Sequence, residues 1–258
     1  MKANSLILKL IDKNIIGTEI YTKNKGDHIL FRMKRSPYSV NVPIEITSNI
    51  GYLIGVIMGD GNISLTSRKH CKYPRTRITI YNNSINYLES LNRILQNEFG
   101  ISGLIWKKKY NNCYVLGLNN KIVFSYFVKF IGLVAAKKLY LNLPKLIKKK
   151  EIFKYYLAGL MDTDGFFTNN TFGIMMNGTN YDFLRKIRNI AYNHYKIKFR
   201  KHAISKIHVR GKEFIRAAMS LSTYSKQDFL NIIQLRHERW VRPELNRSLR
   251  LVRASFVR

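Results

Sequence analysis

Cysteine is nearly absent from this chain of 258 residues, which has only Cys71 and Cys113. Two cysteines cannot form a disulfide framework, and neither has partners at the spacing of a zinc site. Long apolar runs are missing too, because the best stretch, 122–136, is interrupted by Lys129 and cannot span a bilayer. The N-terminus has no secretory signal pattern. We therefore expect an intracellular protein of a reducing compartment that does not cross a membrane.

Acidic residues are also scarce. Fifteen Asp and Glu stand against 45 Lys and Arg, which gives a formal net charge of +30. Such an excess of positive charge indicates a polyanionic partner, normally nucleic acid, with an acidic membrane surface as the alternative. The hydrophobic content of 46% is sufficient for the core of one or two domains.

Two short stretches of the chain are built alike, LIGVIMGDG at 53–61 and LAGLMDTDG at 157–165. Each is an apolar run with small residues that ends in Asp-Gly, and the final aspartates, Asp60 and Asp164, are 104 residues apart. This separation is about the length of a small domain. Apolar residues recur in both stretches at helical spacing. We therefore predict two helices, each ending in an aspartate.

Small residues in these stretches indicate how the two helices meet. Gly55 and Gly59 are four residues apart in the first, and Gly159 and Thr163 are four apart in the second. At this spacing they would form flat strips, so we expect the two helices to pack closely. The final glycines, Gly61 and Gly165, stand where a helix commonly ends in a left-handed residue.

An aspartate at the end of a helix is electrostatically unfavourable, because the last carbonyl groups already carry partial negative charge. Two such carboxylates within ~5 Å would repel each other by about 3 kcal/mol at an effective dielectric of ~20. A divalent cation such as Mg²⁺, which prefers oxygen ligands, removes this penalty. A single Asp-Gly is commonly only a turn. Two copies, each after the same kind of helix, favour a metal-binding pair.

The remainder of the chain predicts the same order of elements twice, αββαββα, which indicates an internal repeat. Each repeat starts with one of the two motif helices. The first continues with strands at 63–66 and 75–81, a helix at 84–99, strands at 104–110 and 113–118, and a helix at 122–131. The second continues with strands at 166–168 and 172–176, a helix at 181–195, strands at 198–203 and 206–210, and a helix at 213–222.

Several predicted strands alternate basic and apolar residues, as a half-buried strand with a basic outer face would. A two-stranded ribbon fits the DNA major groove, whereas a solvated sheet face is the alternative for any single strand. The six histidines match no zinc spacing, so His202 and His208 are expected to face nucleic acid or to be exposed. The predicted nucleic-acid contacts are Arg68, Lys69, Arg75, Arg77, Thr79, Lys107, Lys109, Lys198, Arg200, His202, Lys206, His208 and Arg210.

Two segments lie outside the repeats. Residues 1–47 predict a small basic hairpin with strands at 29–33 and 39–44, which either touches the DNA backbone or is a structural flap. Residues 234–258 form an arginine-rich tail, which is either a short helix that adds phosphate contacts or a disordered basic end.

LAGLMDTDG resembles the LAGLIDADG signature of homing endonucleases, with two positions changed, and LIGVIMGDG resembles a more degenerate copy. Two copies in one chain are similar to the monomeric, pseudo-symmetric branch of that family. The resemblance implies an α+β fold in which two αββαββα repeats form a saddle with antiparallel DNA-binding sheets and a central two-helix interface. It divides the chain into a basic N-terminal extension (1–47), a first repeat (48–147) and a second repeat with its basic tail (148–258).

The same resemblance implies a site-specific endonuclease that hydrolyses both strands of DNA with a divalent metal and leaves short 3′ overhangs. The cofactor would be Mg²⁺ or Mn²⁺, with Ca²⁺ binding without supporting cleavage. The partner would be a double-stranded DNA target, with host intron RNA as a further partner, and the protein would be a monomer in the cytoplasm of an archaeon or in an organelle. The implied metal-site residues are Asp60, Asp164, Gly59 and Thr163, and the implied catalytic residues are Asp60, Asp164, one of Lys137 and Lys138, and Lys226.

Each of the three lysines is equally well explained as a surface residue. Two other functions stay open for the same fold, an intron RNA maturase and a protein that binds DNA or RNA without cutting it. A ribosomal or other structural RNA-binding protein would explain the charge but not the doubled motif.

Overall fold

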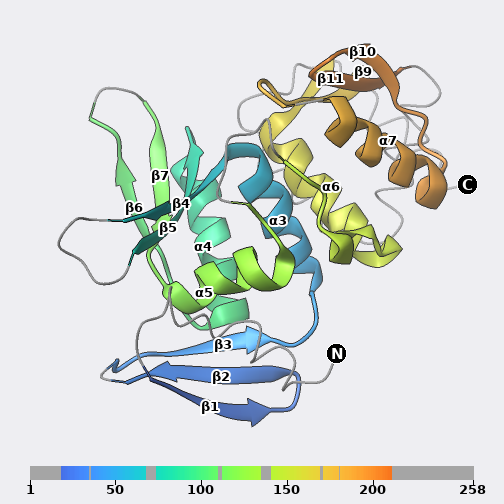
Figure 1. Ribbon diagram of the computed structural model, residues 1–258. Coiled ribbons are helices and arrows are strands. Elements are labelled where there is room, and N and C mark those ends of the chain that lie inside the picture. Colours follow the sequence, from blue (N-terminus) through green and yellow to red (C-terminus); the bar gives the residue numbers. More distant parts are fainter. Residues whose placement is uncertain are drawn as a thin grey trace, which may run out of the picture.

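Two helices lie side by side at the centre of the molecule and pack against each other along their length (Figure 1). They are α3 (Ser48–Asp60) and α6 (Lys150–Asp164), the two helices expected from the repeated motif. The computed structural model describes residues 19–34, 36–67, 74–109, 112–134, 141–168, 171–179 and 181–210.

Each central helix is followed by the same series of elements. The sheet of the first repeat has the strand order β4-β5-β7-β6, and the sheet of the second has the equivalent order β8-β9-β11-β10; all pairings are antiparallel. The predicted repeat is therefore present in the sheet topology. The elements of the first repeat are β4 (Gly61–Thr66), β5 (Arg75–Asn82), α4 (Ile85–Phe99), β6 (Leu104–Lys107), β7 (Tyr114–Leu118) and α5 (Lys121–Ser125).

The second repeat begins with the helix α6, which comes directly after a short 3₁₀ turn, η3 (Lys145–Lys148). The helix predicted at 213–222, which would complete this repeat, lies outside the described residues. The fold is therefore of the expected α+β class with antiparallel sheets. The described elements after α6 are β8 (Gly165–Thr168), β9 (Thr171–Met175), α7 (Tyr181–Tyr195), β10 (Arg200–Ala203) and β11 (Lys206–Arg210).

Local capping signals set the ends of several helices. The Ser84 hydroxyl accepts a hydrogen bond from the Tyr87 N–H at the start of α4, and Gly100 ends this helix in the left-handed conformation, with φ 68°. Asn120 caps α5 through the N–H groups of Ile122 and Val123. The helix predicted at 122–131 differs from the structure, because after Ser125 it continues as a π-helical turn, η1 (Tyr126–Ile131).

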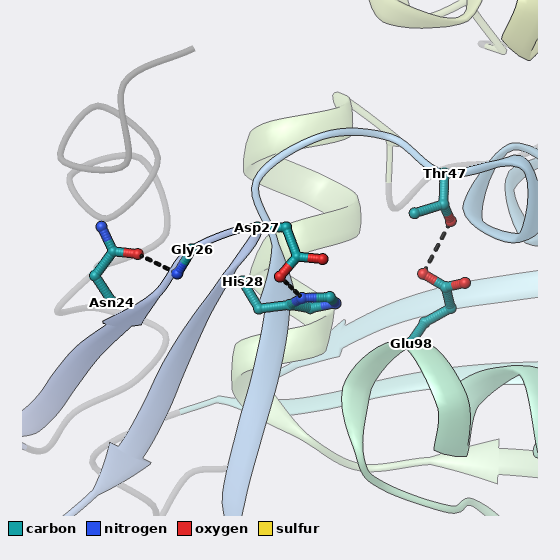
Figure 2. A network of polar contacts seen from close by, with 6 residues as sticks. All are labelled: Asn24, Gly26, Asp27, His28, Thr47 and Glu98. Atoms are coloured by element: carbon teal, nitrogen blue, oxygen red, sulfur yellow. Dashed lines mark hydrogen bonds and ion pairs between the residues drawn. The ribbon is translucent and has the colours of Figure 1, made fainter.

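The start of α3 is fixed by a tertiary contact as well as a local one. The Thr47 hydroxyl accepts a hydrogen bond from the Ile50 N–H and donates one to Glu98 at the end of α4, at 2.9 Å (Figure 2). The Asn49 side chain donates a second hydrogen bond to Glu98, at 2.8 Å. This buried carboxylate lies at the N-terminus of α3, where negative charge is favourable.

The N-terminal extension forms a sheet of three strands rather than the predicted hairpin of two: β1 (Ile20–Lys25), β2 (His28–Met33) and β3 (Ser39–Pro43). Strand β1 is almost entirely exposed, so its sequence lacks the apolar alternation that predicted the other two. A short turn with a contact between Asp27 and His28 joins β1 to β2 (Figure 2).

The N-terminal sheet has one apolar face that packs on α4 and α5 (Figure 1). This packing supports a structural role for the extension, which was one of the two expectations. No helix among the described residues is long and apolar enough to cross a membrane. The fully buried side chains of this face are Ile29, Phe31 and Val42, with Val40 nearly so.

Candidate active site and nucleic-acid interface

The helices α3 and α6 touch through their backbones where they cross. A Cβ atom added to Gly55 would collide with the carbonyl oxygen of Tyr156 and lie 2.7 Å from the backbone nitrogen of Leu160. A Cβ atom added to Gly159 would collide with the carbonyl oxygen of Tyr52. The predicted close approach of the two helices is therefore confirmed at these glycines.

One turn further along, the two helices end at the same side of the molecule. Gly59 of α3 faces Thr163 of α6, and a Cβ atom on Gly59 would be 3.3 Å from Oδ2 of Asp164. Asp164 therefore lies against the last turn of α3, which ends in Asp60. Both aspartates are half-buried. The structure thus brings the two predicted carboxylates to matched ends of parallel helices.

The glycines that follow the aspartates do not have the predicted left-handed conformation. Gly61 has φ −89° and Gly165 has φ −78°, so both are extended and start the strands β4 and β8. Glycine is needed for a steric reason: a Cβ atom on Gly61 would be 2.6 Å from the Cα of Ile57, and one on Gly165 would be 2.7 Å from the Cε of Met161. Each aspartate consequently occupies a sharp corner between a helix and a strand.

The side chains around the two aspartates stay neutral or bond locally. The Thr163 hydroxyl donates to carbonyl oxygens of its own helix, Gly159 and Leu160, each at 3.1 Å. Burial raises the pKa of the Tyr156 hydroxyl, and the charge of Asp164 raises this pKa further. The half-buried carboxylates at this end of the helices are therefore those of Asp60 and Asp164, whereas Asp162 in the same turn of α6 is buried.

A hard divalent cation fits the oxygen donors at this end of the helices. The described residues contain no group of three or more His, Cys, Asp or Glu side chains that could hold a metal ion. Two carboxylates and the carbonyl groups of the last helical turns are thus the protein donors available here. Mg²⁺ commonly binds in this way, with one or two carboxylates completed by water and substrate phosphate.

The outer face of the first sheet carries cations and aromatic rings together. The Arg77 guanidinium donates through Nε to Asn119 Oδ1 at 2.9 Å and lies 5.9 Å from the ring centroid of Trp106. Trp106 is 40% exposed and lies across Gly117, where a Cβ atom would collide with its ring. Arg77 is thereby held in a defined orientation at the surface.

The strand register revises which lysine lies on this outer face. Lys107 pairs with Tyr114, one position after the pair of Trp106 and Val115, so Lys107 belongs to the opposite face. Lys108 lies 4.4 Å from the ring centroid of Tyr81, on the same side as Trp106. The predicted contacts do not include Tyr81, Trp106 and Lys108. The alternation of β5 already places Tyr81 on the same face as Arg77, and the alternation of β6 would have identified Trp106 and Lys108.

The outer face of the second sheet has a similar construction. The ring of Phe166 lies over Gly173, its partner in the register of β8 and β9, and Lys206 Nζ is 4.1 Å from the centroid of that ring. Arg200 and Lys198 are exposed, as expected for contacts with a ligand.

Two of the predicted contacts are buried. Thr79 has 3% and His208 has 6% of its surface exposed. Of the two alternatives expected for His208, exposure to solvent is therefore wrong. Its side chain is on the outer face of the sheet, but the ring of His202 packs against it, with 5.3 Å between centroids. Several other predicted site residues lie outside the part of the chain that the structure describes: Arg68, Lys69, Lys137, Lys138, Lys226 and the side chain of Arg210.

Comparison with known families matches residues 48–132 to the LAGLIDADG-like domain. This part of the chain is therefore similar to that family. This match extends from the helix α3 to the end of η1, and it confirms the resemblance inferred from the motifs. No curated protein is significantly similar to the chain in sequence.

Solved structures of homing endonucleases share the fold beyond the LAGLIDADG-like domain. A structure from a series on mesophilic variants of I-DmoI has a TM-score of 0.52 and 18% identity, covering 69% of this chain and 91% of that one. I-DmoI in complex with DNA and Mn has a TM-score of 0.52 and 17% identity, covering 70% of this chain and 98% of that one. At this identity the likeness establishes the fold alone. It extends beyond residues 48–132, because it covers about 70% of this chain.

Proposed function

We propose that this chain is a homing endonuclease that hydrolyses a phosphodiester bond on each strand of a specific DNA site and leaves short 3′ overhangs. The observation that carries the proposal is that α3 and α6 end on the same side in Asp60 and Asp164, with Asp164 against the last turn of α3. Each helix leads directly into a sheet with cations on its outer face. The fold shared with I-DmoI, which has been solved in complex with its target DNA in the presence of Mn, supports it.

DNA would lie along the outer faces of the two sheets, with the two aspartates facing the phosphates to be cut. Exposed cations such as Arg75 and Arg200 would bind phosphates and base edges on either side. Asp60 would act on one strand and Asp164 on the other. A divalent cation held by these residues would polarise the phosphate and lower the pKa of the attacking water.

The protein's own contribution is to hold two negative charges beside a polyanion. The backbone contact at Gly55 and Gly159 fixes the distance between the helices, and the corners at Gly61 and Gly165 fix where each carboxylate stands. A protein that only binds DNA gains nothing from two carboxylates at this position. This favours cleavage over a protein of the same fold that only binds DNA.

The role of basic residues in catalysis is proposed from the family resemblance. Lys137 or Lys138 in the first repeat and Lys226 in the second would orient water or stabilise the charge that develops on the phosphate. Their contribution can be tested by substituting each with methionine, which keeps most of the side-chain volume and removes the charge.

Substitution of Asp60 or Asp164 by asparagine tests the proposal directly. A DNA target would be selected from a randomised library, or taken as the joined flanks of the host intron or intein. We expect Asp60→Asn and Asp164→Asn each to abolish double-strand cleavage in Mg²⁺, a loss of about 10³-fold or more, because the carboxylate is a metal ligand. Binding to the same DNA in Ca²⁺ should change little.

The matched control is Asp182→Asn, which removes an exposed carboxylate that pairs with Arg185 on α7. It should leave both cleavage and binding unchanged. Unaltered cleavage by either motif variant would refute the proposed roles of the aspartates. Specific binding without cleavage by the unmodified chain would instead identify a non-cleaving protein of this fold.

A further inference from the structure

A buried polar network joins the second motif helix to the first repeat. The Tyr52 hydroxyl of α3 donates a hydrogen bond to Oδ2 of Asp162 on α6, at 2.6 Å. The hydroxyl oxygens of Tyr52 and Tyr87, the latter on α4, are 3.0 Å apart. All three side chains are buried, with Asp162 the most exposed at 9%.

The internal repeat shows that this network exists on one side of the helix interface only. The repeat distance of 104 residues places Tyr156 at the position of Tyr52, and Met58 at the position of Asp162. Methionine cannot accept a hydrogen bond in the way that a carboxylate does. The Tyr156 hydroxyl is buried, and within the described part of the chain it makes no hydrogen bond.

The third element of the network is also missing from the second repeat. Tyr87 is the third residue of α4, and the third residue of α7, a helix of the same length, is Phe183. Phenylalanine has no hydroxyl group, so the second repeat lacks the residues for an equivalent network. The pseudo-symmetric halves therefore hold their motif helices by different means.

The position of the network matters because Asp162 lies two residues before Asp164, in the last turn of α6. A hydrogen bond to a carboxylate is shorter and stronger than one between neutral groups, and burial strengthens it further. The bond to Tyr52 thus holds this last turn against α3. The last turn of α3, which carries Asp60, has Met58 at the equivalent place.

We propose that Asp162 is a positioning residue for Asp164, acting through Tyr52 and Tyr87, so that the two halves of the active site are not equivalent. Cleavage of the strand on which Asp164 acts then depends on the network, whereas cleavage of the other strand does not. The proposal rests on the proposed endonuclease function and adds to it a difference between the two strands.

The first test needs neither metal nor DNA. Tyr52→Phe should lower the melting temperature of the free protein by about 2–8 °C, because it leaves the buried Asp162 without this donor. The matched control is Tyr156→Phe, which removes the equivalent hydroxyl from α6 and should leave the melting temperature unchanged or raise it. Asp162→Met places the residue of the first motif in α6 and removes the acceptor of the same hydrogen bond. The losses in melting temperature caused by Tyr52→Phe and by Asp162→Met should therefore not add when both substitutions are combined.

The second test measures the two strands separately. A duplex target labelled at the 5′ end of each strand in turn would be cut in Mg²⁺ by the unmodified protein and by the two tyrosine variants. We expect Tyr52→Phe to change the ratio of the two strand rates by about 10-fold, because a small displacement of a catalytic group is costly. Tyr156→Phe should leave the ratio unchanged, and Asp162→Asn, which keeps an acceptor oxygen, should give a ratio closer to that of the unmodified protein than Asp162→Met does.

The outcomes separate the two proposals. If Tyr52→Phe slows both strands by the same factor, the network serves general stability and the positioning role is refuted. If Tyr52→Phe and Tyr156→Phe have equal effects on stability, the inferred inequivalence of the two halves is refuted. If the unmodified protein binds its target but cuts neither strand, the endonuclease function fails, and the role of Asp162 in it fails too.

Discussion

The contact between the backbones of α3 and α6 makes a quantitative prediction for Gly55→Ala. The added Cβ would collide with the Tyr156 carbonyl oxygen and lie 2.7 Å from the nitrogen of Leu160, both of them backbone atoms. Carbon atoms are in ordinary contact at about 3.5–4.0 Å, so the helices must separate by roughly 1 Å. Overpacking of this kind costs about 3 kcal/mol at the upper end of its range.

Alanine also has a compensating effect, because it stabilises a helix interior by about 1 kcal/mol relative to glycine. The net loss of stability is then about 2 kcal/mol, which corresponds to a fall in melting temperature of about 4–8 °C for a chain of this size. A displacement of about 1 Å between the two carboxylates should reduce cleavage by about 10²-fold. Thermal unfolding of the metal-free protein and single-turnover cleavage in Mg²⁺ measure the two effects.

Gly51→Ala, on the same face of the same helix, is the matched control. Its Cβ would be 3.0 Å from Cγ2 of Ile152 and 3.2 Å from the carbonyl oxygen of that residue, so the closest obstacle is a side chain that can move. We expect stability within about 1 kcal/mol of the unmodified protein, because the gain in helix propensity offsets the contact. The reasoning would be refuted if Gly55→Ala were as stable as the unmodified protein, or if the two substitutions were equally destabilising.

Three further predictions concern the supports of the site and its surface. Glu98→Ala should lower the free energy of unfolding by about 1–3 kcal/mol in urea titrations, because Thr47 and Asn49 lose their buried acceptor; a neutral result would contradict this. Arg77→Ala should relax discrimination at one base pair by about 1–3 kcal/mol in binding to a panel of single-base variants of the target, whereas a uniform loss at all positions would indicate a phosphate contact. Affinity for DNA should fall by about 10³–10⁵ between 50 and 200 mM salt if 6–10 phosphates are neutralised, and a flat salt profile would exclude binding along the sheets.

Much of the secondary structure was predictable because it depends on neighbours in sequence. The helix α4 begins after Ser84 and ends before Gly100, as their capping preferences indicate, and α7 matches its predicted range. Elements without such local signals were missed. Strand β1 is exposed along nearly its whole length, and nothing in the sequence around Ser125 marks the change from an α-helix to the π-helical turn.

The sequence by itself determined the doubled motif, the excess of positive charge and the basic alternation of the strands, because each is a pattern of residue types along the chain. The tertiary structure decided what those residues do in three dimensions. It replaced the left-handed ends at Gly61 and Gly165 with extended corners, since the strands start there at once, and it moved the outward position from Lys107 to Lys108 through the pairing register. It also revealed the bond from Tyr52 to Asp162, which joins residues 110 positions apart. Contacts of this kind depend on how two helices pack, and no local pattern encodes them.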